Sequence, residues 1–524
     1  MPVKPVTPVI LKGIGSRGLN TQTQSSTIGP EFLTEANNVV YDLEGRMGPR
    51  KGIKQITSAV ASPVKSIGEF VKADRTREYY GGSGATIVKL NFATTPDTLV
   101  TQTFSGTPQT ITDSNWQWIN FNDEFWGVQA GHKVINYDGT DWYDIDDLSG
   151  YHAPSGITTF DPNCALGEFG RIFYGGVTEA KGTLFYSDNL IGQDFNTGAS
   201  GQLDLKTVWG NDEIVGLGSI ENKIVIFGKQ NIAIYSGATN PATMVLDELI
   251  RDVGLAGRDN IVYVDSDVVF LSYEGLQSLS RVQQSDGKSP LESLSLTVRN
   301  DLTRLLAQAD VANIKSVYYQ KEGIVITFMP DDNKAYVFDF TVGKRALPRI
   351  TTWTFKDNPL CAVSTLSGKL YMGLSDSVAE YDKYYDVSLD GGGNDVNSDY
   401  NWLFQTPWLD FGDPVFSKIL KQGLFTITGG EGAAATIEIS KDYEEDSKFS
   451  KTFNLTSDQI TFLYGAANSL YGKAKYAPAA SPKEYRVSLA RAGKTIRLKM
   501  TFDVTGHYSS LINTTLLTKQ GKAR

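Results

Sequence analysis

An internal repeat constrains the fold of this chain more than any other feature. Its clearest copy spans residues 214–236 and contains three short apolar runs, at 214–217, 224–228 and 232–236. Apolar and β-branched runs bounded by turn residues are typical of short strands. Repetition of one such unit with a period of roughly 20 to 50 residues indicates a repeat architecture, so the fold class follows from the repeat.

The same order of runs recurs along the chain. Two further clear copies begin at Cys164 and Cys361, and looser copies complete the series. The predicted central strands begin near residues 79, 125, 172, 224, 268, 324 and 370. Consecutive starts are about 44 to 56 residues apart, close to the blade period of β-propellers. One such sheet cannot bury both faces alone, whereas radial stacking buries each face. The sequence therefore predicts an all-β fold with a β-propeller of about seven blades, some with a fourth, outer strand, as at 141–145.

Three segments stand outside the repeat. The stretch at 1–60 is rich in Gly, Asn, Thr and Pro without sustained periodicity, which predicts an extended N-terminal arm. Between the fifth and sixth copies, apolar residues at three- and four-residue spacing predict an inserted amphipathic helix over 291–306. Strand-like runs after a Gly-rich linker predict a C-terminal β-sandwich at 396–524. The β-propeller is then expected to occupy 61–390.

Charge and cysteine content limit the possible partners and compartments. The net charge of −10 argues against a surface that grips nucleic acid through its phosphates. Cys164 and Cys361 fall at equivalent repeat positions, which predicts small buried hydrophobes, with a single disulfide as the less expected alternative. The sequence has no charged leader and no run of 18 apolar residues, so we expect folding in the cytosol.

Two glycine-containing patterns invite a nucleotide-binding interpretation. Residues 13–18 (Gly-Ile-Gly-Ser-Arg-Gly) have dinucleotide-site spacing, but a polar, unhelical stretch follows where that site needs a helix. The Gly-Lys-Ser and Gly-Lys-Thr triplets at 287–289 and 493–495 lack the upstream glycine of a P-loop, having Val282 and Ser488 there. We interpret the first as part of the arm and the triplets as turns.

The remaining polar and aromatic candidates favour structural roles. His132, His152 and His507 are the only histidines and form no zinc or Ser-His-Asp pattern. The acidic groups at 141–147 and 442–446 could hold Ca²⁺ or supply a glycosidase carboxylate pair, but they match no calcium loop, and solvated turns are the favoured interpretation. Four tryptophans could line a carbohydrate surface, although blade core is the commoner role for such spacing. These four are Trp116, Trp118, Trp126 and Trp142. We therefore predict no enzyme activity, no catalytic, metal or cofactor-binding residues, and no cofactor.

Several motifs in order carry a family resemblance. The front of the chain has Gly-Leu-Asn at 18–20, Ala-Asn-Asn at 36–38 and Gly-Arg-Met-Gly-Pro-Arg-Lys-Gly at 45–52. The middle has the motifs at 167–173, 185–188 and 222–228, and the end has Trp-Leu-Asp-Phe-Gly at 408–412 and the stretch 491–497. This order resembles the tail hub and nozzle proteins of short-tailed bacteriophages, also called packaged-DNA stabilisation proteins or tail tubular protein B. The family's arginine-proline-glycine turn is here Arg-Met-Gly-Pro-Arg.

The resemblance implies a structural virion protein of a podovirus-type tail, assembled in the host cytoplasm. It implies a homohexameric ring that extends the DNA channel below the portal and adaptor, retains packaged DNA, and docks fibres or spikes. Its partners would be further copies of the chain, the adaptor, fibre or spike proteins, and double-stranded DNA passing without sequence-specific binding. The arm and the C-terminal domain are the expected ring contacts. A propeller that binds or processes glycans, and a monomeric peptide-binding scaffold, are the alternatives.

Overall fold

The chain forms two compact units in which strands dominate. The computed structural model describes residues 6–42, 45–93, 96–284, 293–342, 346–384, 398–430, 432–444, 449–456, 482–504 and 506–523. Unit 1 comprises Met1–Lys54, Val337–Lys356 and Asp382–Arg524. Unit 2 comprises Gln55–Tyr336 and Asp357–Tyr381.

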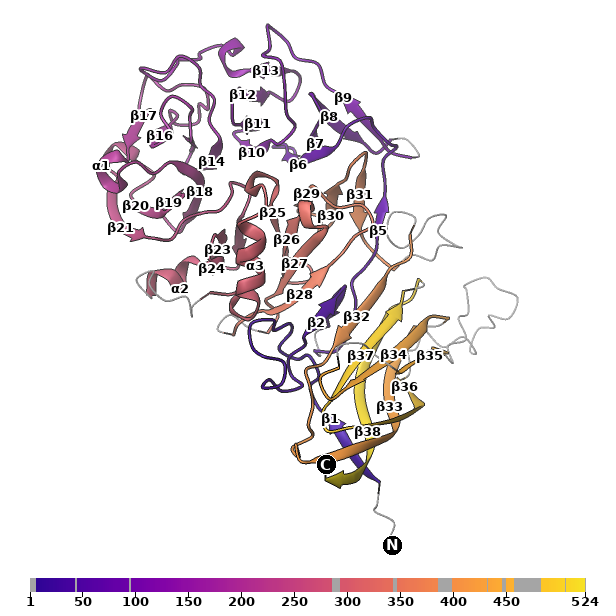
Figure 1. Ribbon diagram of the computed structural model, residues 1–524. Helices are drawn as coiled ribbons and strands as arrows, with labels where there is room; N and C mark the ends of the chain where they lie inside the picture. Colours follow the sequence, from indigo (N-terminus) through magenta and orange to yellow (C-terminus); the bar gives the residue numbers. More distant parts are fainter. Residues whose placement is uncertain are drawn as a thin grey trace. The chain divides into compact units, whose positions relative to one another are not determined.

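Unit 2 is a β-propeller, a succession of small antiparallel sheets that follow one another along the chain (Figure 1). The first sheets are β6 (Val64–Val71), β7 (Arg77–Ser83), β8 (Thr86–Asn91) and β9 (Thr98–Thr101), then β10 (Gln117–Phe121), β11 (Glu124–Gln129), β12 (His132–Tyr137) and β13 (Trp142–Asp144). Next come β14 (Cys164–Glu168), β15 (Arg171–Gly175), β16 (Thr183–Tyr186) and β17 (Gly201–Asp204), then β18 (Ile214–Ile220), β19 (Lys223–Gly228), β20 (Asn231–Ser236) and β21 (Val245–Arg251).

The later sheets of unit 2 have the same order of strands. They contain β22 (Ile261–Val264), β23 (Asp267–Ser272) and β24 (Gly275–Ser278), then β25 (Lys315–Tyr319), β26 (Ile324–Met329) and β27 (Lys334–Asp339), then β29 (Cys361–Ser364), β30 (Leu370–Gly373) and β31 (Val378–Tyr381). The chain passes between the two units four times: within β5 (Ile53–Gln55), within β27, at 356–357 and at 381–382. All the predicted central strands are confirmed, as β7, β11, β15, β19, β23, β26 and β30, each second in its sheet.

Packing between the first and last sheets closes the ring. β6 contacts both β10 and β29. Tyr79 of β7 and Tyr371 of β30 meet edge to face, with ring centroids 5.3 Å apart. The backbone N–H of Ile56, just before β6, donates to the carbonyl oxygen of Val378 in β31 at 2.9 Å. The stretch before the first sheet therefore runs along the last sheet, which leaves the ring without a free first-to-last seam.

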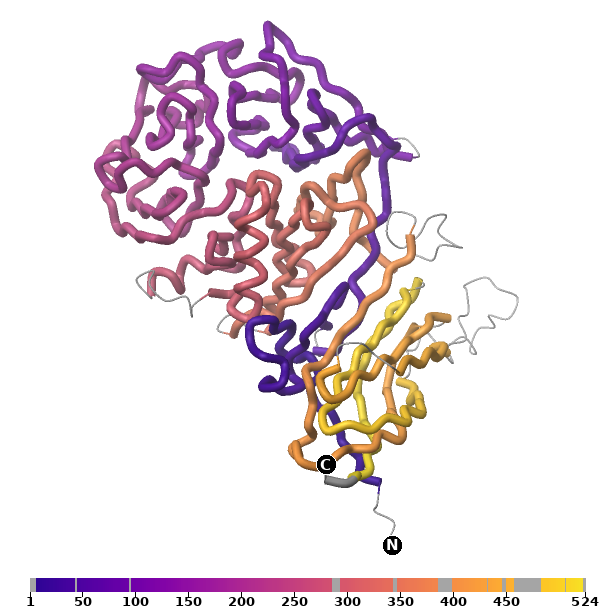
Figure 2. The backbone as a smooth tube through the Cα atoms, in the orientation of Figure 1, coloured from indigo at the N-terminus to yellow at the C-terminus, as the bar shows by residue number. Residues whose placement is uncertain are grey.

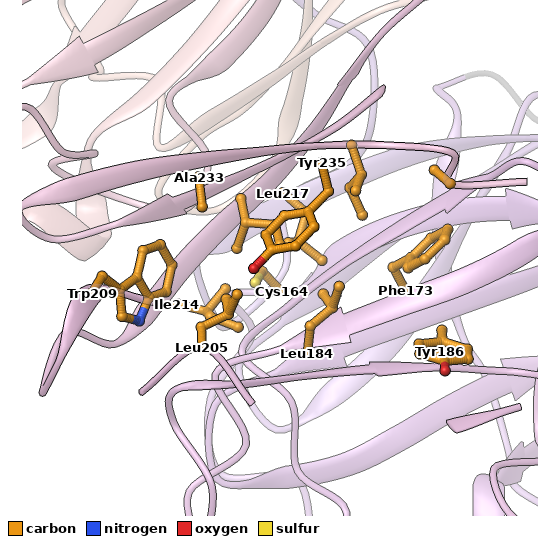
Figure 3. Close-up of a cluster of buried hydrophobic side chains, with 13 residues drawn as sticks. Cys164, Phe173, Leu184, Tyr186, Leu205, Trp209, Ile214, Leu217, Ala233 and Tyr235 are labelled. Carbon is orange, nitrogen blue, oxygen red and sulfur yellow. The ribbon is translucent and has the colours of Figure 1, made fainter. Parts of the chain in front are cut away.

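Glycines at the end of the second strands let neighbouring sheets pack closely. A Cβ at Gly175 would lie 2.5 Å from Cγ2 of Ile214, on the next sheet's first strand. A Cβ at Gly373 would lie 2.3 Å from the carbonyl oxygen of Val64 on β6. Cys164 pairs with Gly175, inside the apolar cluster between β14–β17 and β18–β21 (Figure 3). The glycine at the end of these second strands is therefore a packing requirement.

Short helices connect some strands of unit 2. They are α1 (Lys206–Trp209), α2 (Leu279–Gln284) and α3 (Arg299–Leu306), with 3₁₀ turns at Ile145–Asp147, Pro241–Thr243, Leu296–Val298, Val311–Asn313 and Pro330–Asp332. The helix α3 buries Leu302, Leu305 and Leu306 and lies within the range of the predicted amphipathic helix. Leu291, the first residue of that prediction, lies outside the described residues.

Unit 1 contains two sheets that combine the two ends of the chain (Figure 2). One has the order β3 (Val39–Tyr41), β4 (Met47–Pro49), β38 (Ser509–Ala523), β33 (Phe416–Gly429) and β36 (Pro482–Gly493), with β1 (Thr7–Leu11) also on β38. The other has the order β28 (Arg349–Trp353), β2 (Glu35–Asn37), β32 (Asn401–Gln405), β37 (Ile496–Asp503), β34 (Ala434–Lys441) and β35 (Phe449–Asn454). Trp402 Nε1 on β32 donates to Oγ of Ser509 on β38 at 3.1 Å, so side chains of the two sheets meet.

The front of the chain, where an extended arm at 1–60 is expected, contributes short strands to unit 1. Thr7 is in register with Thr518, and Glu35 is in register with Gln405. The short strands β1 to β4 from the front of the chain thus take part in both sheets of unit 1, where their backbone groups find ladder partners. The boundaries expected near 60 and 395 stay predictions, whereas the contacts group 1–54 with the C-terminal stretch.

Candidate functional site

The first strands of the unit 2 sheets line a cavity of about 510 Å³ at the centre of the propeller. It is lined by residues from β6, β10, β14, β18, β22, β25 and β29. Small residues stand where neighbouring inner strands approach each other: a Cβ at Gly68 would lie 2.6 Å from Trp118, and one at Gly167 would lie 2.7 Å from Ile119. These first strands run in the same direction, so their N-terminal ends gather at one end of the cavity.

A cluster of charged and amide side chains occupies that end. Arg258 donates through Nη2 to Oδ1 of Asn115 at 3.0 Å, and through Nε to Oδ1 of Asp259 at 3.0 Å. Its Nη1 donates to the carbonyl oxygen of Asn163 at 3.1 Å. Lys315, the first residue of β25, donates to both Asn115 Oδ1 and Asp259 Oδ2. These five residues precede or begin four different inner strands, so the cluster links sheets across the cavity. We call Asn115, Arg258, Asp259 and Lys315 the central cluster.

The charges of the central cluster are strongly coupled. Burial raises the pKa of Asp259, but the charges of Arg258 and Lys315 and their hydrogen bonds outweigh burial and hold that pKa well below its usual range. The pKa of Lys315 is lowered from its usual value, because burial, together with the neighbouring Arg258, outweighs the raising effect of Asp259. Asp259 is therefore ionised at neutral pH and carries the negative charge of the cluster.

Other hydrogen bonds hold the cluster in place. The buried Asn260 donates from Nδ2 to the carbonyl oxygen of Ile314 at 3.1 Å, which ties the segment before β22 to the segment before β25. Lys65 of β6 lies near the same end, and its Nζ is 2.8 Å from Oδ1 of Asp113. Ser66 donates from Oγ to the carbonyl oxygen of Ser114 at 2.8 Å.

The opposite end of the cavity contains Glu69 of β6. Glu69 accepts hydrogen bonds from the Tyr79 hydroxyl at 3.1 Å and from the Leu366 backbone N–H at 2.8 Å. Arg77 forms an ion pair with the same carboxylate at 3.7 Å. The charge of Glu69 is therefore compensated locally.

Both cysteines are buried free thiols, as predicted, and each is the first residue of an inner strand. Burial raises the pKa of each thiol to about 12, against the smaller opposite effects of Arg258 at Cys164 and Lys315 at Cys361. Such thiols are poor nucleophiles, so they act as packing residues.

Of the glycine-containing patterns, those within the described residues lie in turns and close backbone contacts. Residues 13–18 are not followed by a helix, and a Cβ at Gly18 would lie 2.6 Å from the backbone nitrogen of Ile350. The triplet at 493–495 lies between β36 and β37, where Asp442 Oδ1 accepts from the backbone N–H of Lys494 at 2.6 Å. The triplet at 287–289 lies outside the described residues.

The histidines are not brought together. The ring of His132 packs edge to face on Trp116 at 5.0 Å. His152 Nδ1 lies 3.3 Å from Oδ1 of Asp194 in a loop contact. His507 lies in the turn before β38. Across the described ranges, no three His, Cys, Asp or Glu side chains are placed to hold a metal ion.

The first acidic group organises loops. Asp144 is fully buried and accepts from the backbone N–H of Gln109 at 2.7 Å. Asp146 pairs with Lys133 at 2.5 Å, and Asp147 accepts from the backbone N–H of Thr107 at 3.0 Å. In the second group, residues 445 and 446 lie outside the described residues.

The tryptophans belong to the interior of the propeller. Trp116, Trp126 and Trp142 are no more than 2% exposed, and Trp118 stacks on Phe125 at 5.0 Å. Blade core is thus the role of three of the four, as favoured from their spacing.

The central cluster was not predicted, because its members are 143 and 200 residues apart in the chain. The available signal was Arg258 and Asp259 shortly before β22 and Lys315 at the start of β25.

No protein-family model and no curated protein matches the chain. Among solved structures, it is similar to the WD40 β-propeller domain of Doa1, at 9% identity and a TM-score of 0.37, covering 63% of this chain and 96% of that chain. The WD40 domain of Neurospora crassa Pan2 gives 10% identity and a TM-score of 0.36, covering 64% and 97%. The extracellular domain of the putative hybrid two-component system BT3049 from B. thetaiotaomicron has 9% sequence identity and a TM-score of 0.41, and the match covers 82% of this chain and 59% of that chain. These are likenesses of fold and assign no family.

Within the described ranges, no helix has the length and apolar character needed to span a membrane.

Proposed function

We propose that this chain is a structural protein of a podovirus-type tail. In this proposal it forms a ring, with six copies expected, that extends the DNA channel below the portal and adaptor, retains packaged DNA and docks fibres or spikes. The observation that carries the proposal is the clustering of the family-like motifs from the front and the end of the chain in unit 1. The motifs at 18–20, 36–38, 45–52, 408–412 and 491–497 all belong to that unit.

Direct contacts join four of these motifs in two pairs. Asn38 Oδ1 accepts from Arg50 Nε at 2.9 Å, which connects the second and third motifs. Leu409 and Ile496 exchange backbone hydrogen bonds at 2.8 and 3.0 Å, which connect the last two. Motifs that are scattered in sequence but adjacent in space are the pattern expected when a resemblance concerns one folded module. This supports the family resemblance over a chance match of short strings.

The centre of the propeller supports a channel formed between copies. The cavity of about 510 Å³ has the size of a small-molecule pocket, and the central cluster occupies one of its ends. A duplex therefore has no path through one subunit, and a conduit requires several subunits around it. The net charge of −10 suits a channel through which DNA slides, because such a surface does not retain phosphates.

The same proposal includes the finer features of the architecture. We count seven blades, one for each inner strand that lines the cavity. We interpret the two sheets of unit 1 as a β-sandwich and propose unit 1 for the ring contacts. The proposed location is the virion tail, after assembly in the host cytoplasm, and the proposed mode is structural and non-enzymatic.

Mass measurement and electron microscopy test this proposal. The full-length protein is purified and measured alone and after mixing with purified adaptor rings of the same phage. Sixfold rings, or sixfold density bound to the adaptor, are expected. A protein that stays monomeric at all concentrations and ignores adaptor rings contradicts the proposal. Stabilisation of that monomer by glycans would favour the glycan-binding alternative.

A further inference from the structure

The central cluster contains more positive than negative charge. Arg258 and Lys315 are both cationic, and their side chains are only 7% and 10% exposed. Asp259 is the only carboxylate that pairs with them among the described residues. The nearby Lys65 and Asp113 compensate each other. With Lys315 protonated, the buried cluster therefore carries one excess positive charge.

Carboxylates elsewhere do not balance this excess. Glu69, the other acidic residue lining the cavity, already pairs with Arg77. Glu69 also lies four residues beyond Lys65 on β6, a rise of roughly 13 Å along a strand. An unpaired charge in a buried site is expensive unless a counter-charge or a proton change compensates it.

The two cations also have unused hydrogen-bond donors. A guanidinium has five N–H groups and an ammonium has three. Nη1 of Arg258 carries two N–H groups and has one acceptor, the carbonyl oxygen of Asn163. The protonated Nζ of Lys315 carries three and has two acceptors. Each nitrogen therefore has one N–H without an acceptor within the described part of the chain. Both side chains line the cavity, together with Gln117, whose Oε1 accepts from the Ala165 N–H at 3.0 Å. The Gln117 amide nitrogen supplies a third donor.

We propose that the cavity binds a small oxyanion, a carboxylate or phosphate group, against Arg258 and Lys315. Charge-assisted hydrogen bonds to guanidinium and ammonium groups are the strong contacts for such anions. The cavity volume of about 510 Å³ leaves room for the group and for the rest of a small molecule. The alternative way to remove the excess charge is loss of the Lys315 proton, in which case no anion binds. The inference is independent of the tail proposal.

Calorimetric titration of the full-length protein tests the inference. Sodium phosphate and sodium acetate are the two probes, in low-chloride Tris buffer at an ionic strength fixed with sodium fluoride. Saturable binding of one anion per chain is expected for at least one probe, and the stronger probe identifies the headgroup class. Absence of saturable binding by both probes overturns the proposal.

Two variants assign the binding to the cluster. Lys315→Gln removes the excess charge, so affinity should fall at least tenfold. Lys89→Gln is the matched control, because Lys89 pairs with Glu78 at 2.6 Å and does not line the cavity; its affinity should stay within twofold of wild type. Equal losses in both variants, or equal binding in both, overturn the assignment. If Lys315→Gln does not fold, phosphate is titrated into the wild-type protein again and its binding is monitored by the broadening of the ³¹P line. Broadening that does not saturate contradicts the inference.

Discussion

Arg50 donates a hydrogen bond from Nε to Oδ1 of Asn38 at 2.9 Å, and its side chain is completely buried. Its Nη2 donates to the carbonyl oxygen of Thr354 at 2.8 Å. The ring centroids of Phe355 and Tyr400 lie 4.4 and 4.3 Å from its guanidinium carbon. One cation thus holds together three separate stretches of unit 1, through hydrogen bonds and contacts with aromatic faces.

Replacing Arg50 with lysine should destabilise unit 1 by about 3 kcal/mol, because an ammonium group cannot reproduce the planar fork and leaves buried acceptors unpaired. Hydrogen exchange of peptides covering β2 and β4, together with urea unfolding, measures the change. Arg46→Lys is the control in the same motif. Arg46 is 33% exposed in its pair with Asp42, so its replacement should change the free energy of unfolding by less than about 1 kcal/mol. Similar effects of the two variants would contradict this role for Arg50.

The repeat in the sequence predicts the propeller strands because each blade is local. The strand that ends at Gly228 pairs with strands that are close to it in sequence. Apolar runs separated by turn residues are therefore enough to predict it. Unit 1 depends on partners that are far apart: Thr518 donates to the carbonyl oxygen of Thr7, 511 residues away. Strands of three residues, such as β2, are too short for a periodic signal, so the sequence gives no strand prediction for the front of the chain.

The central cluster escaped prediction for a related reason. Asn115 and Lys315 each follow a loop, and neither belongs to a recognisable chemical motif. Their association follows only from the closure of the ring, which brings the starts of distant inner strands to one end of the cavity. The cysteines could be predicted as buried, because equivalent positions in a repeat share one environment.

Gly373→Ala should destabilise unit 2 by about 1–3 kcal/mol, because the added Cβ would lie 2.3 Å from the backbone oxygen of Val64 and 2.6 Å from Cys361 Sγ. Gly218→Ala is the matched control on an inner strand. Its Cβ would lie 3.4 Å from the nearest atom, on Phe227, so a change below about 0.5 kcal/mol is expected. Thermal and urea unfolding report both values, and a tolerated Gly373→Ala would refute the close-packing explanation.

Cys164 and Cys361 should resist thiol reagents in the folded protein. A pKa of about 12 leaves both thiols protonated through pH 9, and burial blocks access. A chromogenic disulfide reagent should detect no fast thiol in native protein and two in denaturant. The rate at which the reagent reacts with the folded protein should not rise between pH 7 and 9, whereas the rate for a free cysteine does. Rapid reaction of either thiol in the native protein would contradict the prediction, and the variants Cys164→Ser and Cys361→Ser would then identify the reactive residue.

Asp259 should contribute stability at neutral pH that is lost in acid. Its pKa in the folded protein is held below the unfolded value, about 3.9, by Arg258 and Lys315 despite the opposing effect of burial. The contribution is complete above the unfolded pKa and declines as pH falls from about 4 toward the folded pKa. The difference in unfolding free energy between wild type and Asp259→Asn should therefore be constant from pH 5 to 8 and shrink below pH 4. A difference that grows in acid would contradict the ionised state of Asp259.

Asp144 should show the opposite pH dependence. Burial raises its pKa above the ordinary value, and the Gln109 backbone N–H and the nearby His132 and Lys133 offset only part of that shift. Since protonation is then easier in the folded than in the unfolded protein, the stability contribution of this group increases as pH falls through the folded pKa. Asp144→Asn keeps an acceptor for the Gln109 N–H and removes the buried charge, so its unfolding free energy relative to wild type should be highest at neutral pH and decrease in acid. Urea unfolding from pH 4 to 8 measures the trend, and a relative stability that rises in acid would show that the Asp144 carboxylate is favoured in the folded protein.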